Sequence, residues 1–476
     1  MKIALVLLFT SQFFGIYQIF ALNTYPVTMF DVGMLAFYAA AFKKIIWDGE
    51  TLEFPRNVAV FCLFGIVIAS ILSAVIPVLD GEPVKQFQYL KTCTHFLYLL
   101  LMVILCAGLN IKVSDWKFSI QVLMVAAIGV NIFGMYQLAA RALDLPFAWF
   151  NLNSVAFANR GGYDLAAVNQ GDVRQLSLNY GSFYRATSIF SEPSALASFC
   201  MFILTAQLVP FLRGADNFIR SQKFNIILSI LTIISLFLTF SLTALTLFLG
   251  FVVFAFVTER SKQSIKLIKI IGVVALVIIC TNAVVEFATD ISVSSLFTQR
   301  VGGIVSKITG GRAETTGGES FFGRLSTIEY ALEVWYRYPL TGIGMGCYYY
   351  YDKSEAHGFS DSGLFSCLSE TGFFGFLMYI GILGGLVFVF KKYVLSNDYN
   401  RLKPDTKLMS HFSLYNVMLM MIASFTANTF VSSYFWLEIA LFYSIVVAIA
   451  KETGMPVIRF RVMDVPLKNM LYKATY

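Results

Sequence analysis

Residues 57–78 read NVAVFCLFGIVIASILSAVIPV, an apolar run without a charged residue. A helix needs roughly 17 to 25 such residues to cross a hydrocarbon layer about 30 Å thick, so this run fits a membrane-spanning helix. Similar runs recur along the 476-residue chain, which is 58% hydrophobic and only 13% charged, with mean hydropathy +0.72. A water-soluble core cannot hide this much apolar surface, so the sequence predicts an all-α polytopic membrane protein.

The apolar runs predict about twelve transmembrane helices. They lie at residues 3–20, 27–42, 57–78, 87–109, 118–140, 191–212, 223–240, 242–258, 265–285, 363–390, 411–428 and 432–450. The first run resembles a signal peptide, but no convincing A-x-A cleavage site follows it, so we keep it as the first span. Two long loops, residues 141–190 and 286–362, separate the helical blocks 1–140, 191–285 and 363–476.

Positive charge between the spans predicts the orientation of the chain. The short connections on one side are all basic, with Lys43, Lys44, Lys112, Arg213, Lys266, Lys391 and, in the tail, Lys451. Because basic loops stay in the cytoplasm, we predict that both termini are cytoplasmic and that the two long loops lie outside. The net charge of +7 then serves orientation, so we expect the lipid bilayer and not nucleic acid as a partner.

The cysteines and acidic residues do not predict a metal or redox centre. Five of the seven cysteines lie inside apolar runs, and there is no CxxC pair. Cys347 and Cys367 are placed for a bridge outside the membrane, although buried or free thiols are the favoured interpretation. The long loops lack an Asp-x-Asp pair and the helices lack a His/Glu cluster, so we expect no cofactor and no catalytic metal.

The first long loop ends in residues 185–194, RATSIFSEPS, directly before an apolar run. Ser191 as N-cap, with Glu192 and Pro193 in the first turn, predicts a helix that begins at the outer membrane surface. Arg185 then lies close to a positive helix end, where N–H groups and a guanidinium suit a phosphate-bearing group. An ion pair between Arg185 and Glu192 is the alternative, and the spacing leaves both open.

The second long loop combines a glycine-rich piece with a helical pattern. Residues 302–318 are rich in glycine, which predicts a flexible lid or linker rather than a phosphate-binding loop. An amphipathic helix on the outer surface is then predicted by apolar residues at helical spacing, namely Phe321, Leu325, Ile328, Leu332 and Trp335. Arg324 falls off this stripe near the helix start, where either a ligand phosphate or a carboxylate such as Glu319 would balance its charge.

Aromatic residues and a histidine complete the candidates in this loop. Tyr336 and Arg337, with the tyrosines at 348–351, suit sugar rings but also an interfacial aromatic belt. His357 lies just before a span and suits a general base that deprotonates a hydroxyl, although a lone histidine is more often structural.

Lys91 and His95 lie four residues apart on one face of the fourth predicted span. Ionisable residues inside a span are costly and indicate function, so this pair predicts a polar cavity open to the outer face. A midplane relay in a transporter is the alternative, but the chain halves lack matching broken helices.

Taken together, these motifs resemble the Wzy-type O-antigen polymerase and O-antigen ligase superfamily of bacterial inner-membrane glycosyltransferases, whose fold is GT-C-like. The resemblance rests on residues 185–194, on Gly323-Arg324 with residues 335–344 (WYRYPLTGIG), and on His357 with residues 364–375 (LFSCLSETGFFG). The motif order, the two long loops and the number of spans agree over nearly the whole chain.

The resemblance implies that Arg185 and Arg324 hold a lipid diphosphate and that His357 activates the acceptor. Many members have asparagine or serine after this histidine, whereas Gly358 and Phe359 follow it here. Arginines can neutralise a departing diphosphate without a metal, which agrees with these roles. The remaining candidates for substrate binding are Arg337, Glu192, Lys91, His95 and Tyr336.

These observations predict a metal-independent polysaccharide polymerase in the bacterial inner membrane. It would join polyprenyl-diphosphate-linked repeat units into O-antigen or a similar polysaccharide at the periplasmic face, with a chain-length regulator and a flippase as implied partners. The closest alternative is an O-antigen ligase, which uses the same donor but transfers the glycan to a lipid A core sugar.

Overall fold

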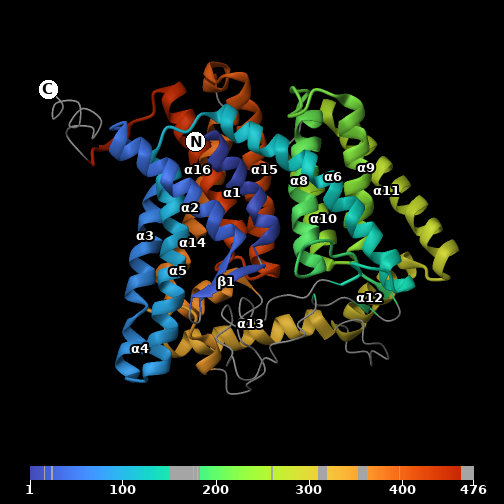
Figure 1. The fold of residues 1–476 in the computed structure, drawn as a ribbon, viewed down its shortest axis with the longest axis horizontal. Helices are drawn as coiled ribbons and strands as arrows, with labels where there is room; N and C mark the ends of the chain where they lie inside the picture. The colour runs from blue at the N-terminus through green and yellow to red at the C-terminus, as the bar shows by residue number, and fades with distance from the viewer. Residues whose placement is uncertain are drawn as a thin grey trace.

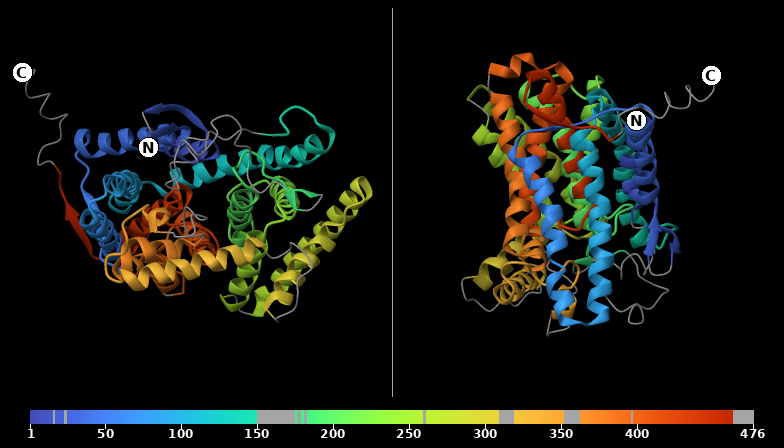
Figure 2. Two further views of the ribbon diagram at one scale, coloured as in Figure 1. Left: turned by 90° about the horizontal axis from the view of Figure 1, so that it is seen from below. Right: turned by 90° about the vertical axis from the view of Figure 1, so that its left-hand side faces the viewer.

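A computed structural model describes residues 1–15, 17–22, 25–149, 175, 179–180, 183–258, 261–308, 319–351, 362–395 and 397–462. Long helices run side by side between two faces of the molecule (Figure 1). Met1 and the strand β6 (Val457–Phe460) lie at one face, which we call the terminal face. Helix α13 (Glu319–Arg337) lies across the opposite face, which we call the α13 face (Figures 1 and 2).

The other helices are α1 (Lys2–Ser11), α2 (Met29–Phe42), α3 (Val58–Leu72), α4 (Val75–Asp80), α5 (Pro83–Gly108), α6 (Val113–Leu143), α8 (Pro193–Arg213), α9 (Gln222–Leu238), α10 (Leu242–Thr258), α11 (Ser261–Thr289), α12 (Val293–Ile308), α14 (Gly363–Leu395), α15 (Pro404–Thr426) and α16 (Ser433–Thr453). Short 3-10 or π turns are η1 (Gln12–Phe14), η2 (Lys43–Trp47), η4 (Tyr348–Tyr351) and η5 (Asn397–Arg401). The strands form antiparallel pairs: β1 (Gln18–Leu22) with β2 (Tyr25–Thr28), β3 (Leu52–Pro55) with β6, and β4 (Asn179–Tyr180) with β5 (Phe183–Tyr184).

A helix occupies each predicted span, so the protein is an all-α polytopic membrane protein. Among the described residues, eight helices are long and apolar enough to cross a membrane: residues 58–80, 83–108, 113–143, 193–213, 265–288, 363–394, 404–426 and 433–453. The other predicted spans are occupied by α1, α2, α9 and α10, which have 10, 14, 17 and 17 residues. Each of the about twelve predicted spans therefore contains a helix, and eight of these helices, among the described residues, are long enough to cross the membrane.

The first predicted span, residues 3–20, is wrong in its second half. The helix ends at Ser11, η1 continues to Phe14, and the chain then turns into the hairpin β1–β2. Thr28 starts α2 with a capping box, in which Asp31 Oδ2 accepts the Thr28 N–H at 2.8 Å and the Thr28 side chain accepts the Asp31 N–H. The apolar run misled the prediction because the exposed hairpin residues Ile19 and Phe20 continue its composition.

The predicted amphipathic helix is present as α13, and the side that packs against the protein carries small residues instead of the apolar stripe noted in the sequence. Its buried side chains are Thr327, Ala331 and Val334, which pack toward Ile343 and Tyr348. The larger residues of the predicted stripe that the structure describes are half-buried or exposed: Leu325, Ile328, Leu332 and Trp335. The small side chains allow close packing on the protein, which leaves the large ones for the membrane interface.

Two further details of the second loop differ from the prediction. Gly302 and Gly303 of the glycine-rich piece lie within helix α12 instead of a linker, while residues 309–318 lie outside the described part. Since α13 begins at Glu319, Arg324 belongs to its second turn rather than to its first. The free N–H groups at the helix start therefore oppose the positive charge of Arg324 less than they would in the first turn.

We predict that Tyr336→Cys and Lys391→Cys will react with a membrane-impermeant maleimide from opposite sides of the membrane. Both side chains are exposed, and helix α14 leads from the α13 face to the terminal face, where Lys391 lies near its end; its 33 residues measure roughly 50 Å at a rise of 1.5 Å per residue. A Cys280→Ser background removes the one exposed cysteine among the described thiols. Labelling of both positions in intact spheroplasts would contradict this topology.

Candidate functional site

The described part of the α13 face holds two polar clusters. One surrounds a kink in α14 and the loop Pro339–Cys347, and the other surrounds two arginines at the ends of α6 and α9. Both clusters lie where the chain leaves regular helical geometry within or beside the membrane. Backbone groups are costly to leave unpaired there, so the polar contacts of these segments follow directly from the fold.

The loop Pro339–Cys347 is bound to α14 through backbone hydrogen bonds. The N–H groups of Ile343 and Gly344 donate to the carbonyls of Ser369 and Glu370 at 3.0 Å each. In return, the N–H of Phe373 donates to the carbonyl of Pro339 at 2.8 Å. The two motifs that are separate in the sequence, residues 335–344 and 364–375, therefore form one unit, which we call the α14 clamp.

Two glycines make the α14 clamp possible. Gly372 has φ +69° and ψ −172°, which interrupts the helical path of α14 in a region that side chains other than glycine rarely adopt. A Cβ at Gly372 would lie 2.2 Å from the Leu340 carbonyl oxygen. A Cβ at Gly342 would lie 2.4 Å from the Glu370 carbonyl carbon. Contact at this distance between backbones requires glycine at both positions.

Glu370 places a carboxylate inside the clamp. Its side chain is buried, and Oε2 accepts the Gly346 N–H at 3.0 Å. Cys347, the next residue, is a free buried thiol, as is Cys367, which confirms the favoured interpretation of this pair. Burial raises the pKa of Cys347, so its thiol stays protonated, and Sγ donates to the Lys85 carbonyl at 3.5 Å.

Lys85 connects the clamp to the turn between α4 and α5. Its Nζ lies 3.0 Å from Asp80 Oδ2 and 3.1 Å from Glu82 Oε1. Tyr351 adds its ring, 4.6 Å from the Lys85 ammonium, and donates its hydroxyl to Asp80. Burial and the neighbouring Asp80 raise the pKa of Tyr351, so this hydroxyl remains a donor. These contacts fix the chain at the last residue before segment 352–361, which carries His357.

The second cluster is centred on Arg141, which is only 5% exposed. Its Nε donates to the Ala148 carbonyl at 3.0 Å, and Nη2 donates to Gln175 Oε1 at 2.9 Å and to Thr187 Oγ1 at 2.7 Å. Nη1 donates to the Arg185 carbonyl at 2.5 Å. Among the described residues no carboxylate forms an ion pair with Arg141, so its buried positive charge is met there by hydrogen-bond acceptors and by the Trp149 ring, whose centroid lies 5.1 Å from the guanidinium carbon.

Arg185 lies beside Arg141 and is 8% exposed. Its Nε donates to the Thr239 carbonyl at 3.0 Å, at the C-terminal end of α9, where the helix dipole favours a cation. No ion pair joins Arg185 to Glu192, both of which the structure describes, so the salt-bridge alternative is wrong. The phosphate-binding interpretation of Arg185 stays a prediction.

The residues after Arg185 fold into the bundle. The N–H of Ala186 donates to the Leu238 carbonyl at 2.9 Å, and Ser188 Oγ donates to the Val130 carbonyl at 2.7 Å. Val130 precedes Arg141 by about three turns of α6, so the segment enters the helix layer. The following helix begins at Pro193 with Glu192 as N-cap, not Ser191, and the Glu192 carboxylate accepts the Ser194 hydroxyl.

The structure places the remaining predicted residues as follows. Arg337 and Tyr336 lie at the end of α13, where Arg337 pairs with Glu333 and the Tyr336 ring lies 5.1 Å from that of Trp335. Lys91 and His95 are half-buried on α5, the helix that also carries Lys85. Arg324 is in α13, but its side chain is outside the described part, as is the whole of His357.

Sequence reasoning missed Arg141, Gln175, Lys85 and Glu370 as site residues. Glu370 had a usable signal, because a single carboxylate inside an apolar run indicates function. Arg141 also had one, as the charged residue that closes an apolar run. The partners of Gln175 could not be foreseen, since it contacts segments that lie 13 and 34 residues away.

The charge of the second cluster suits an anionic ligand. Among the described residues, no group of three His, Cys, Asp or Glu side chains is placed to hold an ion. Arg141 and Arg185 instead place two buried arginines near the membrane border, and the Arg141 guanidinium contacts the Arg185 backbone carbonyl. Positive charge in such a low-dielectric place attracts phosphate groups more strongly than it does in water.

We predict that Gly372→Ala will lower the thermal stability of the purified protein, while Gly384→Ala in the same helix will not. Alanine at Gly372 is strained by its backbone angles, which costs about 1–3 kcal/mol, and clashes with Leu340. A Cβ at Gly384 meets no atom within 4 Å, and alanine favours a helix by roughly 0.5–1 kcal/mol over glycine. Equal unfolding midpoints in detergent would contradict the role of the α14 clamp.

Comparison with known proteins identifies one region. Residues 227–380 match a family model described as O-antigen ligase. This region extends from α9 into α14 and includes α13, the loop Pro339–Cys347 and the kink at Gly372. No curated protein matches the chain significantly.

Proposed function

The chain belongs to the O-antigen ligase superfamily of glycosyl-transferring enzymes, and from this premise we propose that it polymerises lipid-linked oligosaccharide repeat units. The donor is a glycan on polyprenyl diphosphate, and the acceptor is a sugar hydroxyl of the incoming repeat unit. The reaction takes place at the α13 face, the periplasmic side of the bacterial inner membrane. A flippase supplies the repeat units and a chain-length regulator acts on the product.

The observation that carries the proposal is the buried pair Arg141 and Arg185 on the α13 face. Glycosyl transfer breaks the bond between the anomeric carbon and a diphosphate oxygen, and negative charge develops on that oxygen. Arg141 has no carboxylate partner in the described chain, so a bound diphosphate would meet positive charge that the protein has not already neutralised. Arginines supply this charge without a metal.

The other half of the reaction is the attack of the acceptor. As the acceptor oxygen forms its bond to the anomeric carbon, its proton passes to a ring nitrogen of His357. The contacts of Lys85 and Tyr351 support this role, because they hold the chain at the start of the segment that carries His357. Proton transfer needs this histidine within hydrogen-bond reach of the acceptor hydroxyl.

Helix α13 fits a donor whose lipid stays in the membrane. Its half-buried Ile328, Leu332 and Trp335 suit the boundary between lipid and water. A diphosphate attached to a polyprenyl chain lies at this same level. Arg324, on the second turn of α13, then binds diphosphate together with Arg185, and Tyr336 and Arg337 contact the glycan.

We expect reconstituted protein to convert polyprenyl-diphosphate repeat units into a ladder of products in the presence of a chelator. Arg185→Gln, Arg324→Ala and His357→Ala should each lower the rate by on the order of 100-fold or more, as loss of transition-state stabilisation does. Arg459→Gln is the matched control, because Arg459 is exposed on the strand β6 and its ion pair among the described residues is with Glu53. Full activity in the Arg324 and His357 variants, with protein folded and inserted, would refute their roles.

The description of the family match favours a second candidate, an O-antigen ligase. Donor binding is the same for both enzymes, because only the acceptor differs. A strain that lacks a polymerase should accumulate product with a single repeat unit, whereas a strain that lacks a ligase should accumulate full-length polymer on the polyprenyl carrier. If the deletion strain accumulates full-length polymer on the polyprenyl carrier, the protein is a ligase and not a polymerase.

A further inference from the structure

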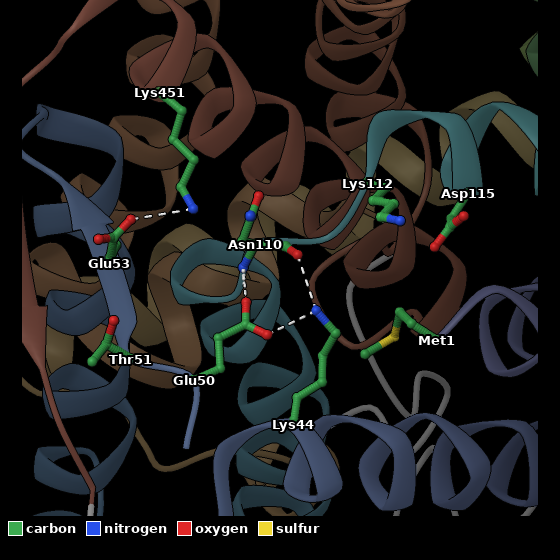
Figure 3. A pocket seen from close by; sticks show the side chains of 9 residues that line it. All are labelled: Met1, Lys44, Glu50, Thr51, Glu53, Asn110, Lys112, Asp115 and Lys451. Atoms are coloured by element: carbon green, nitrogen blue, oxygen red, sulfur yellow. Dashed lines mark hydrogen bonds and ion pairs between the residues drawn. The ribbon is translucent and has the colours of Figure 1, made fainter. Parts of the chain in front are cut away.

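A cleft of about 480 Å³ opens at the terminal face, on the opposite side from the arginine pair. Segments far apart in the sequence form it: the N-terminus, the end of η2 with the start of β3, the turn between α5 and α6, and the end of α16 (Figure 3). Its charged lining residues are Lys44, Lys112, Lys451, Glu50, Glu53 and Asp115. The cleft thus combines both signs of charge in one small space.

Two walls of the cleft are held by ion pairs. Lys44 Nζ lies 2.8 Å from Glu50 Oε2, and Glu50 Oε1 accepts the Asn110 N–H at 3.0 Å. Lys451 Nζ lies 3.2 Å from Glu53 Oε2, on the strand β3 that pairs with β6 (Figure 3). These contacts fix the walls in place, so the cleft is a built feature of the fold.

The third wall is the start of α6, and its charges are not used by the part of the protein that the structure describes. Lys112 and Asp115 form no side-chain hydrogen bond or ion pair with any residue that the structure describes. Lys112 is the N-cap of this 31-residue helix and gives it no side-chain cap. The N–H groups of the first turn therefore add to the Lys112 ammonium as a site for an anion. Asp115 offers an acceptor for a cation beside it.

The position of the cleft indicates that its ligand comes from the membrane. Its walls are the ends of α5, α6 and α16, which is the level where membrane helices pass into the lipid headgroups. Beside Lys44, the side chains of Phe42, Ile46 and Trp47 are exposed. Exposed apolar side chains in the same segment as a lysine are expected at an interface.

We propose that this cleft binds the headgroup of a phospholipid that carries both a phosphodiester and a primary amine, the chemistry of phosphatidylethanolamine. The phosphate lies at Lys112 and the start of α6, the ammonium donates to Asp115, and the acyl chains pass over Phe42 and Trp47. Both unpaired side chains then gain partners of opposite charge. The proposal is independent of the glycosyl transfer proposed for the α13 face.

The test is native mass spectrometry of the purified protein with three phospholipids that have the same acyl chains. Phosphatidylethanolamine has both groups, phosphatidylcholine lacks the N–H donors, and phosphatidylglycerol lacks the amine. We expect phosphatidylethanolamine to bind at least about threefold more tightly than either. Lys112→Gln and Asp115→Asn should each weaken it on the order of tenfold, the loss of one charge-assisted contact.

Matched variants separate this site from general effects of charge. Lys391→Gln removes the same charge from an exposed position near the end of α14 and should leave the lipid preference unchanged. Lys112→Arg keeps the cation and should keep most of the binding, which also guards against a folding defect in Lys112→Gln. An unchanged unfolding midpoint in each variant confirms that the cleft is intact.

Two results would overturn the proposal. Equal binding of phosphatidylglycerol and phosphatidylethanolamine, with no effect of Asp115→Asn, would show an anion site without a role for the amine. Competition by soluble O-phosphoethanolamine at a concentration equal to that of the lipid would show that the ligand is a free phosphoamine and that the membrane contributes nothing.

Discussion

Every backbone N–H and carbonyl of this chain that enters lipid needs a partner within the protein, because water cannot supply one there. Helices satisfy this need by themselves, so the segments that leave helical geometry decide the rest of the structure. Residues 185–190 donate to carbonyls of α6 and α9, and the loop Pro339–Cys347 exchanges hydrogen bonds with the kink of α14. Both departures lie on the α13 face, so the irregular backbone and the polar side chains that complete it occur together.

The same constraint explains which side chains gather there. Arg141 satisfies the carbonyls of Ala148 and Arg185, and Gln175 satisfies those of Ser188 and Phe190. The polar residues that bond the non-helical backbone are thus the same ones that give the α13 face its buried polar groups. At the α14 clamp, glycine solves the problem instead, because only a residue without Cβ lets the two backbones meet at Gly372. Structure and candidate chemistry therefore depend on the same few contacts.

The sequence predicted what depends on local composition and missed what depends on distant contacts. Apolar runs located the membrane helices, and helical spacing located α13. The run through Phe20 concealed a hairpin, since strands and helices of similar composition differ only in their partners. The side of α13 that packs on the protein could not be predicted, because Thr327 and Ala331 fit against Ile343 and Tyr348, which lie in another segment. The partners of Arg141 were hidden for the same reason, although the Arg185 motif itself was recognised.

The two arginines of the α13 face differ in what they can give to a ligand. A guanidinium has five N–H donors, and four hydrogen bonds from Arg141 already go to protein oxygens. Arg141 can therefore offer a diphosphate little direct hydrogen bonding, but its charge acts through a poorly screened interior over several ångströms. Its hydrogen bond to the Arg185 carbonyl also fixes the backbone of its neighbour. In the proposed reaction, Arg141 would therefore position Arg185 and set the local potential, and direct contact with phosphate would fall to Arg185.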